Sequence, residues 1–190
     1  MTAYSDLAAI PPFRYGLIVA DPPWSYENWS KAGEHKNASA KYDCMGLEDI
    51  KAMQIGHLAA KDCVLWLWAT NPLLDQAFDV MRAWGFQFKT AGHWSKKTKT
   101  GKQAFGTGYI LRCAGEPFLI GTVGKPNLTR SVRSVIEGPV REHSRKPEEA
   151  FQAAELLCGS VPRLELFSRQ ERDGWDVFGN ETSKFSEVAV

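Results

Sequence analysis

The segment Tyr15-Gly16-Leu17-Ile18-Val19-Ala20-Asp21-Pro22-Pro23-Trp24 constrains the fold of this chain more than any other stretch. Its first six residues form an apolar run of the kind that a strand buried on both faces shows. The run ends on an acid, and in open α/β sheets the functional groups gather in the crevice at the carboxyl ends of the strands. We therefore expect Asp21 to lie at a functional edge of a buried sheet.

The residues that follow this run form a rigid set of hydrogen-bond acceptors. Asp21 precedes a proline, which favours an extended backbone at the acid. Pro22 and Pro23 have no amide hydrogen, so the turn offers carbonyls and few donors. An ionised Asp21 side chain only accepts, and Trp24 adds a flat aromatic ring. This combination suits a planar ligand that carries an amine.

Apolar runs and helical patterns alternate along the rest of the chain. Strands are expected in residues 15–20, 63–68, 86–94, 110–113, 117–123, 135–140, 163–167 and 175–178. Helices are expected in residues 46–53, 72–84 and 147–157, whereas residues 1–14 show only a weak pattern. The alternation predicts an α/β fold with a mainly parallel sheet. A length of 190 residues fits a single domain that spans residues 1–190.

Three segments rich in lysine and arginine lie between the predicted sheet elements, at residues 31–41, 96–102 and 125–133. We expect them on loops around Asp21, where their task is phosphate contact, which positions a nucleic acid without specifying its bases. Trp29, Tyr42, Trp94 and Tyr109 lie in or beside the first two segments. Basic grooves with stacking aromatic residues commonly hold single strands.

Composition sets bounds on metals and on location. The net charge is +1 and 44% of the residues are hydrophobic, as in ordinary soluble globular proteins. The four cysteines and four histidines show no metal-ligand spacing, so we expect no metal and a reducing compartment. The N-terminus shows no signal pattern and no apolar run is long enough to span a bilayer. We therefore expect a cytoplasmic protein without membrane contact.

The quartet Asp21-Pro22-Pro23-Trp24 resembles the catalytic motif of adenine amino-methyltransferases, and the whole stretch resembles the MT-A70 family, in a bacterial or phage type. Further pieces resemble the same family in the same order. They are Tyr42, residues 66–68, Trp94, Gly115-Glu116, residues 143–149, residues 165–169 and Gly179-Asn180. The resemblance covers nearly the whole chain, and the order and spacing of the pieces make it specific.

The resemblance implies a seven-stranded Rossmann-like methyltransferase fold in permuted order, with the catalytic half first and the cofactor half second. The sequence agrees with that order in one respect. No glycine-rich loop follows the first strand, where an unpermuted dinucleotide-binding fold carries one. The cofactor elements are therefore expected in the second half of the chain.

The cofactor that the resemblance implies is S-adenosylmethionine. Lys146, just before a helix start, is expected to hold the methionine carboxylate, and Asp6 is a candidate contact for the cofactor's adenine. The other expected cofactor-binding residues are Asp21, Glu165, Phe167, Arg169 and Asn180. After the strand expected at residues 163–167, the chain departs from the eukaryotic pattern. Gln170-Glu171-Arg172-Asp173 replaces a Pro-His-Asn run, and Glu181 replaces a glutamine.

The implied reaction is methyl transfer to the exocyclic N(6) amine of adenine, on a base that is unpaired or flipped out of the duplex. Asp21 and the Pro22 carbonyl are expected to accept the two amine hydrogens, while Trp24 stacks on the base. The expected catalytic residues are Asp21, Pro22, Pro23, Trp24 and Glu116. The expected substrate-binding residues are Tyr42, Trp94, Lys96, Lys97 and Arg130.

Several interpretations of the substrate stay open at this point. DNA is favoured by analogy with short bacterial and phage modification enzymes, and RNA is the alternative. A non-catalytic subunit that holds nucleic acid is a further interpretation, against which the intact Asp21-Pro22-Pro23-Trp24 quartet argues. A methyltransferase acting on a protein or a small molecule fits the basic loops less well. A monomer or a homodimer is expected.

Overall fold

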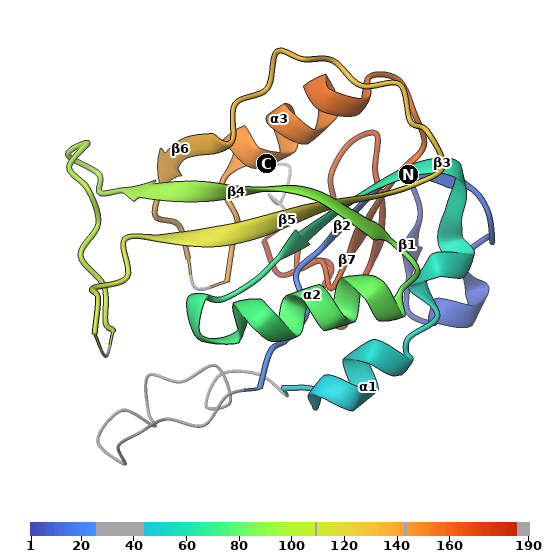
Figure 1. Ribbon diagram of the computed structural model, residues 1–190, viewed down its shortest axis with the longest axis horizontal. Helices are drawn as coiled ribbons and strands as arrows, with labels where there is room; N and C mark the ends of the chain where they lie inside the picture. Colours follow the sequence, from blue (N-terminus) through green and yellow to red (C-terminus); the bar gives the residue numbers. More distant parts are fainter. Residues whose placement is uncertain (26–43, 109, 143, 186–190) are drawn as a thin grey trace.

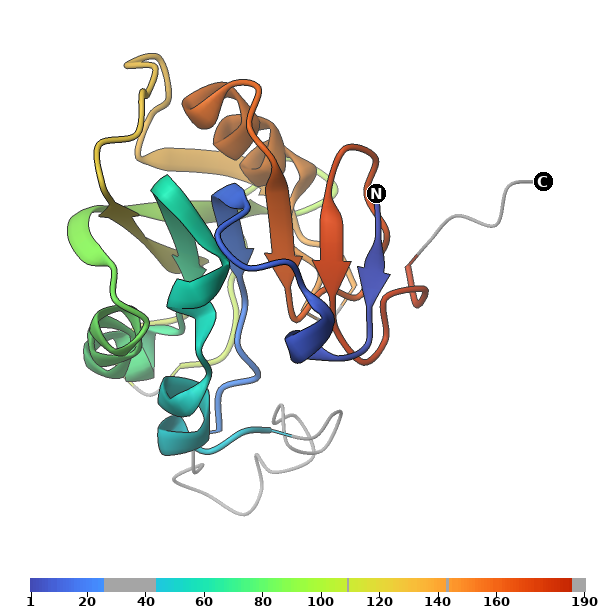
Figure 2. The ribbon, with the colours of Figure 1, turned by 90° about the vertical axis from the view of Figure 1, so that its right-hand side faces the viewer.

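The computed structural model describes residues 1–25, 44–108, 110–142 and 144–185. Eight strands within these residues form one sheet in the order β1-β8-β7-β2-β3-β5-β4-β6 (Figures 1 and 2). In chain order the strands are β1 (Ala3–Tyr4), β2 (Tyr15–Ala20), β3 (Ala59–Trp68), β4 (Gln87–Lys97), β5 (Gly115–Val123), β6 (Val135–Pro139), β7 (Arg163–Leu166) and β8 (Asp176–Phe178).

Helices cover both faces of the sheet. The α-helices are α1 (Leu47–Ala52), α2 (Leu74–Ala83) and α3 (Glu148–Cys158), and short 3-10 helices span Leu7–Ala9, Ile55–Leu58 and Asn71–Leu73. Helices α1 and α2 lie on one side of the sheet and α3 lies on the other (Figure 1). Within the described part of the chain, no helix is both long enough and apolar enough to cross a membrane.

Strands β2 and β3 form the buried centre of the sheet because their side chains are apolar on both faces. All six residues of β2 are buried. Leu17 and Val19 pack in the same core as Phe151 of α3, whereas Ile18 and Ala20 face the core shared with α1 and α2. A parallel sheet covered on both faces needs such continuous apolar runs.

The directions of the strands bring the functional segments to one edge of the sheet. Strand β2 is parallel to β3 and β7, so the residues that follow these strands, among them Asp21 and Phe167, lie at the same edge. Strand β5 is antiparallel to β3, so it begins at this edge with Gly115 and Glu116. We call this side of the sheet the carboxyl edge.

The predicted α/β class and mainly parallel sheet are confirmed, and the three predicted helices are present. The predicted strand at residues 110–113 is wrong, since Ile110 and Leu111 are 86% and 82% exposed and lie in no strand. The sheet also has one strand more than the seven that the resemblance implied. The two-residue strand β1 pairs with β8 and is too short for any sequence pattern to reveal.

Strand β4 is longer than predicted and includes the first lysines of the segment expected to be a flexible loop. Lys96 and Lys97 lie opposite Gly138 and Pro139 in the pairing of β4 with β6. Their ammonium groups form ion pairs with Glu116 and Glu137. Tertiary pairing therefore overrides the low strand propensity of consecutive lysines.

The free energy of unfolding should respond strongly to truncation of the central strands. Leu65 in β3 is fully buried, so Leu65→Ala leaves a cavity and should destabilise the protein by about 2–5 kcal/mol. Leu156→Ala in α3 is a matched control, because that side chain is 57% exposed and the change should cost within about 0.5 kcal/mol. Urea unfolding measures both, and equal effects would contradict the placement of β3 at the centre.

Candidate active site

The turn after β2 presents Asp21 from a tightly held backbone. Trp24 N donates to Pro22 O at 2.8 Å. The Trp24 indole is buried, and its Nε1 donates to Trp68 O at 3.2 Å, at the end of the neighbouring strand β3. These bonds fix the turn against the sheet, so the Asp21 carboxylate is held at the carboxyl edge.

Asp21 belongs to a chain of alternating charges. Its Oδ2 accepts a hydrogen bond from Lys146 Nζ at 2.6 Å, and the same ammonium lies 3.1 Å from Glu116 Oε2. Glu116 Oε1 in turn accepts from Lys96 Nζ at 2.5 Å. The Lys146 side chain is 9% exposed, and its ammonium lies 5.4 Å from the ring centre of Trp68. Four segments of the chain therefore meet at one ammonium-carboxylate cluster.

Burial and charge pairing act in opposite directions on these groups. Burial raises the pKa of Glu116, but Lys146 and Lys96 lower it more, to about 2. Burial lowers the pKa of Lys146, but Asp21 and Glu116 outweigh it, so the pKa is raised overall. Burial is the largest effect on Asp21 and raises its pKa although Lys146 opposes it. Lys146 is thus charged at neutral pH, and Asp21 is protonated more easily than Glu116.

A hollow opens at the carboxyl edge beside this cluster. Two residues of its wall, Ser144 and Phe167, have positive φ angles of 67° and 62°. Such angles are unfavourable for residues with a Cβ and often occur at functional sites. The residues that line the hollow are Val19, Asp21, Trp68, Ser144, Arg145, Lys146, Phe151, Glu165, Leu166, Phe167, Arg169, Gln170, Arg172 and Phe185.

Glu165 in β7 presents a buried carboxylate to the hollow. Its side chain is 14% exposed, and Arg172 Nε lies 3.9 Å from its Oε2. Among the described residues, Oε2 has no hydrogen-bond partner. Burial raises the pKa of Glu165 to about 7, although Arg172 opposes this. A buried acceptor without a partner costs free energy, and a ligand that donates hydroxyl hydrogens would satisfy it.

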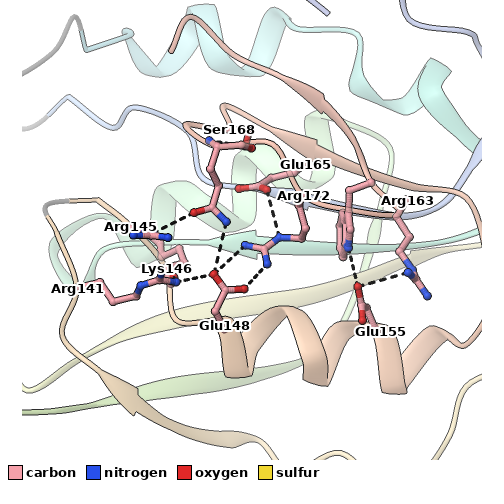
Figure 3. Close-up of polar contacts among 11 residues, drawn as sticks. Arg141, Arg145, Lys146, Glu148, Glu155, Arg163, Glu165, Ser168 and Arg172 are labelled. Carbon is pink, nitrogen blue, oxygen red and sulfur yellow. Dashed lines mark hydrogen bonds and ion pairs between the residues drawn. The ribbon is translucent and has the colours of Figure 1, made fainter. Parts of the chain in front are cut away.

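A second group of ion pairs is centred on Glu148 at the start of α3, and Arg172 links it to Glu165 (Figure 3). The Glu148 carboxylate accepts from Arg141 Nη1 at 2.5 Å and also forms an ion pair with Arg172. Burial raises the pKa of Glu148, but Arg172 and Arg141 lower it more, to about 2. The ionised Glu148 therefore holds the Arg172 guanidinium in place beside Glu165.

The groups that line the hollow fit S-adenosylmethionine. A lysine ammonium suits a ligand carboxylate, and a carboxylate such as Glu165 suits a pair of hydroxyl donors. S-adenosylmethionine carries both, as the carboxylate of its amino acid and the hydroxyls of its ribose. This fit rests on Oε2 of Glu165, which accepts no hydrogen bond from the described residues.

The aromatic residues expected beside the base are placed differently. Trp24 and Trp94 are only 4% and 2% exposed, and each donates its ring N–H to a backbone carbonyl, Trp24 to Trp68 O and Trp94 to Gly138 O. Neither ring has an open face, so the stacking predicted for Trp24 does not agree with its position. Tyr42 lies outside the described residues, as do Trp29, residues 31–41 and Tyr109.

The prediction that all three basic segments surround Asp21 is wrong for the third. Strand β5 runs away from the carboxyl edge, so the segment that follows it starts at the opposite side of the sheet. Lys125 N there donates to Asp62 near the beginning of β3, and Thr129 N donates to Leu157 O near the end of α3. Arg130 is exposed in this distant loop and does not reach the Asp21 cluster.

Two further residues that were predicted to contact the cofactor, Asn180 and Asp6, do not line the hollow. Asn180 is exposed in the turn after β8 and does not line the hollow. The neighbouring Gly179 is tightly packed, because a Cβ there would lie 2.2 Å from Ser168 O. Asp6 accepts from Ala8 N and caps the short helix Leu7–Ala9, so its carboxylate is already engaged.

The structure also adds residues that the sequence did not single out. Arg145, Gln170, Arg172 and Phe185 all line the hollow. Arg145 Nε donates to Gln170 Oε1 at 3.0 Å, and its guanidinium lies 5.2 Å from the ring centre of Phe185. The available signal was the departure of residues 170–173 from the eukaryotic pattern, because both Gln170 and Arg172 fall in that segment.

A mainly parallel α/β sheet with this acid-Pro-Pro-Trp turn beside such a hollow defines a Rossmann-like methyltransferase. Residues 15–181 match the MT-A70 family. The chain therefore belongs to the MT-A70 family, whose members are S-adenosylmethionine-dependent adenine N(6)-methyltransferases.

Individual relatives differ in how much of their length the chain spans. It is 27% identical over 190 residues to the type II methyltransferase M.MunI of Mycoplasma sp, covering 90% of this chain and 79% of that protein. It is 27% identical over 176 residues to an Arabidopsis thaliana N(6)-adenosine-methyltransferase MT-A70-like protein, covering 88% of this chain and 24% of that protein. It is 26% identical over 204 residues to the human N(6)-adenine-specific methyltransferase METTL4, covering 97% of this chain and 42% of that protein.

The buried Glu165 should make stability depend on pH. Its pKa is about 7 in the folded protein against an ordinary 4.5, so the folded state binds the proton more tightly between these values. Stability is therefore lost as pH rises through this window, by about 3 kcal/mol at most. Glu165→Gln cannot titrate, so its unfolding free energy should fall less between pH 5 and pH 8. Exposed Glu149→Gln is the control, and a wild-type slope for Glu165→Gln would contradict the burial.

Proposed function

We propose that this protein transfers a methyl group from S-adenosylmethionine to the N(6) amine of adenine in DNA, with Asp21 as the residue that contacts the amine. The fixed position of the Asp21 carboxylate, beside the Lys146 ammonium and at the mouth of the hollow, is the observation that carries this proposal. Pro22, Pro23 and Trp24 hold the turn, and Glu116 completes the charge balance around Lys146.

The acceptors of the turn are suited to activating an aromatic amine. The amine of adenine is a poor nucleophile because its lone pair is delocalised into the ring. Oδ2 of Asp21 is bonded to Lys146, so we assign Oδ1 to the first amine hydrogen. Pro22 O already accepts from Trp24 N and has a second lone pair for the other hydrogen. With both hydrogens bonded the nitrogen can pyramidalise, which is catalysis by positioning and electrostatic stabilisation.

Residues of the hollow would bind S-adenosylmethionine, the methyl donor, at its carboxylate and at its ribose. S-adenosylmethionine supplies an electrophilic methyl group on its sulfonium. Lys146 would bind its carboxylate and Glu165 its ribose hydroxyls, while Phe167 and Arg169 form the wall between them. Arg172 keeps the Glu165 carboxylate in position.

A nucleic acid would enter along the ends of β4 and β5. Lys96 bonds Glu116 of the cluster, and Lys97, the next residue of β4, is 27% exposed, so we propose both as contacts for the incoming strand. Tyr42 remains the residue proposed to contact the base. The chain matches the bacterial type II methyltransferase over most of that protein's length and the eukaryotic proteins over less than half of theirs. We take this size match as support for DNA over RNA.

Loss of the Asp21 carboxylate tests the proposed chemistry. Asp21→Ala should lower methyl transfer to DNA by roughly 100-fold or more, the scale seen when one aligned polar group is removed from a reacting centre. Asp75→Ala, which removes an exposed acid at the start of α2, should leave the rate unchanged. Rates with labelled S-adenosylmethionine and melting temperatures are compared. Turnover near the wild-type rate in a folded Asp21→Ala protein would refute the assignment.

Removal of the buried lysine tests the cofactor assignment. Lys146→Ala should weaken S-adenosylmethionine binding by about 1–3 kcal/mol, the range for losing a hydrogen bond to a charged group. Lys61→Ala, at an exposed lysine in β3, should bind as the wild type does. Isothermal calorimetry gives both affinities, and Lys146→Arg, which keeps the charge, should recover part of the loss. Wild-type affinity in the Lys146→Ala protein would exclude this role.

A further inference from the structure

Residues 98–108 and 110–114, between β4 and β5, form an arm that extends beyond the ends of the two strands (Figure 1). The arm has an ordered backbone in its described residues. Thr98 N donates to Lys102 O at 2.8 Å, and Gly106 N donates to Cys113 O at 2.8 Å. The Gln103 amide donates to Lys96 O at 3.0 Å and to Ala114 O at 2.7 Å, which ties the arm to its base.

The outer part of the arm exposes large apolar side chains. Phe105, Ile110 and Leu111 are 81%, 86% and 82% exposed. They are absent from both cores of the described protein. Neighbouring exposed apolar side chains of this size, on a segment with its own hydrogen bonds, mark a contact surface for another molecule.

The charge of the arm indicates which molecule it contacts. Residues 95–114 contain four lysines and one arginine and no acid: Lys96, Lys97, Lys99, Lys102 and Arg112. The Arg112 guanidinium lies 5.6 Å from the ring centre of Phe105, so cationic and aromatic groups are presented together. A polyanion with flat apolar surfaces matches this combination, whereas the same arm of a second copy of the chain would bring like charges together.

The base of the arm lies at the candidate active site. Lys96, near the end of β4, and Glu116, near the start of β5, are bonded to each other at its base. Glu116 also contacts the Lys146 ammonium that holds Asp21. A molecule bound by the arm is therefore held next to the Asp21 carboxylate, which is proposed to contact the adenine amine.

We propose that the apolar tip of the arm inserts between base pairs of duplex DNA and takes the place of the adenine that leaves the stack. The tip consists of Phe105, Ile110 and Leu111. The phosphates are contacted by Lys99, Lys102 and Arg112. This inference rests on the proposed function. An adenine inside a duplex cannot reach Asp21, and apolar side chains that enter a base step compensate for the lost stacking. The substrate is accordingly a duplex from which the adenine is extruded.

Permanganate footprinting tests the insertion without relying on methylation or on a known target sequence. Permanganate oxidises thymines that have lost stacking, including the partner of an extruded adenine. Wild-type protein on a mixed-sequence DNA duplex should create strongly reactive thymines. The triple variant Phe105→Ala, Ile110→Ala, Leu111→Ala should reduce that reactivity at least fivefold, at protein concentrations that saturate the DNA. Leu156→Ala, at an exposed leucine of α3, should behave as the wild type does.

Methylation rates provide the second measurement. The triple variant should methylate duplex DNA at least tenfold more slowly than the wild type and the same DNA as a single strand within twofold of the wild type. The double variant Lys99→Ala, Lys102→Ala should instead weaken binding to both forms and reduce the dependence of affinity on salt. The three apolar side chains are exposed, so melting temperatures should be unchanged.

The outcomes separate the insertion from the proposed function. Reactive thymines without methylation of any nucleic acid would support the insertion and refute the methyl transfer. Methylation of duplex DNA with an unchanged ratio of duplex to single-strand rates in the triple variant would refute the insertion alone. The insertion is also refuted if wild-type protein creates no reactive thymines. A wild-type dimer in sedimentation that the triple variant abolishes would assign the apolar tip to a second copy of the chain and equally refute it.

Discussion

The buried ammonium of Lys146 is the interaction on which the arrangement of the site depends. It bonds Asp21 at 2.6 Å and Glu116 at 3.1 Å, so it joins the turn after β2, the start of β5 and the segment before α3. Two carboxylates cannot remain ionised side by side in a buried place without such a cation. Loss of one partner would leave an unpaired buried charge, which costs far more than an exposed ion pair contributes.

The topology explains why groups so distant in sequence meet there. Parallel strands deliver the residues that follow them to one edge, and the antiparallel β5 adds Glu116 from its amino end. Helix α3 begins at the same edge, where Glu148 orients Arg172 against Glu165. The charge cluster on one side and the Glu165 carboxylate on the other thus share a single rigid frame, which serves a reaction that depends on positioning.

The sequence predicted the elements whose signals are local. The apolar run of β2, the acid at its end and the helical patterns all sufficed, because burial and periodicity determine them directly. Prediction failed where contacts between residues distant in sequence determine the position of a side chain. Arg130 lies far from Asp21 because β5 is antiparallel, and Trp24 is buried because its indole bonds the end of β3. Arg172 falls in the segment that departs from the eukaryotic pattern, but its role could not be predicted, because that role comes from Glu148 and Glu165, 24 and 7 residues away. The exposed Ile110 and Leu111 have strand-like sequence without a partner strand.

Identification of the methylated product decides whether this protein methylates adenine in DNA. The wild-type protein is incubated with S-adenosylmethionine labelled in its methyl group and with DNA or RNA, each as single and double strands. The nucleic acid is then digested to nucleosides, which are separated and identified by mass. We expect N(6)-methyldeoxyadenosine from DNA as the labelled product. Label found in RNA alone, on another base, or on no nucleic acid would contradict it.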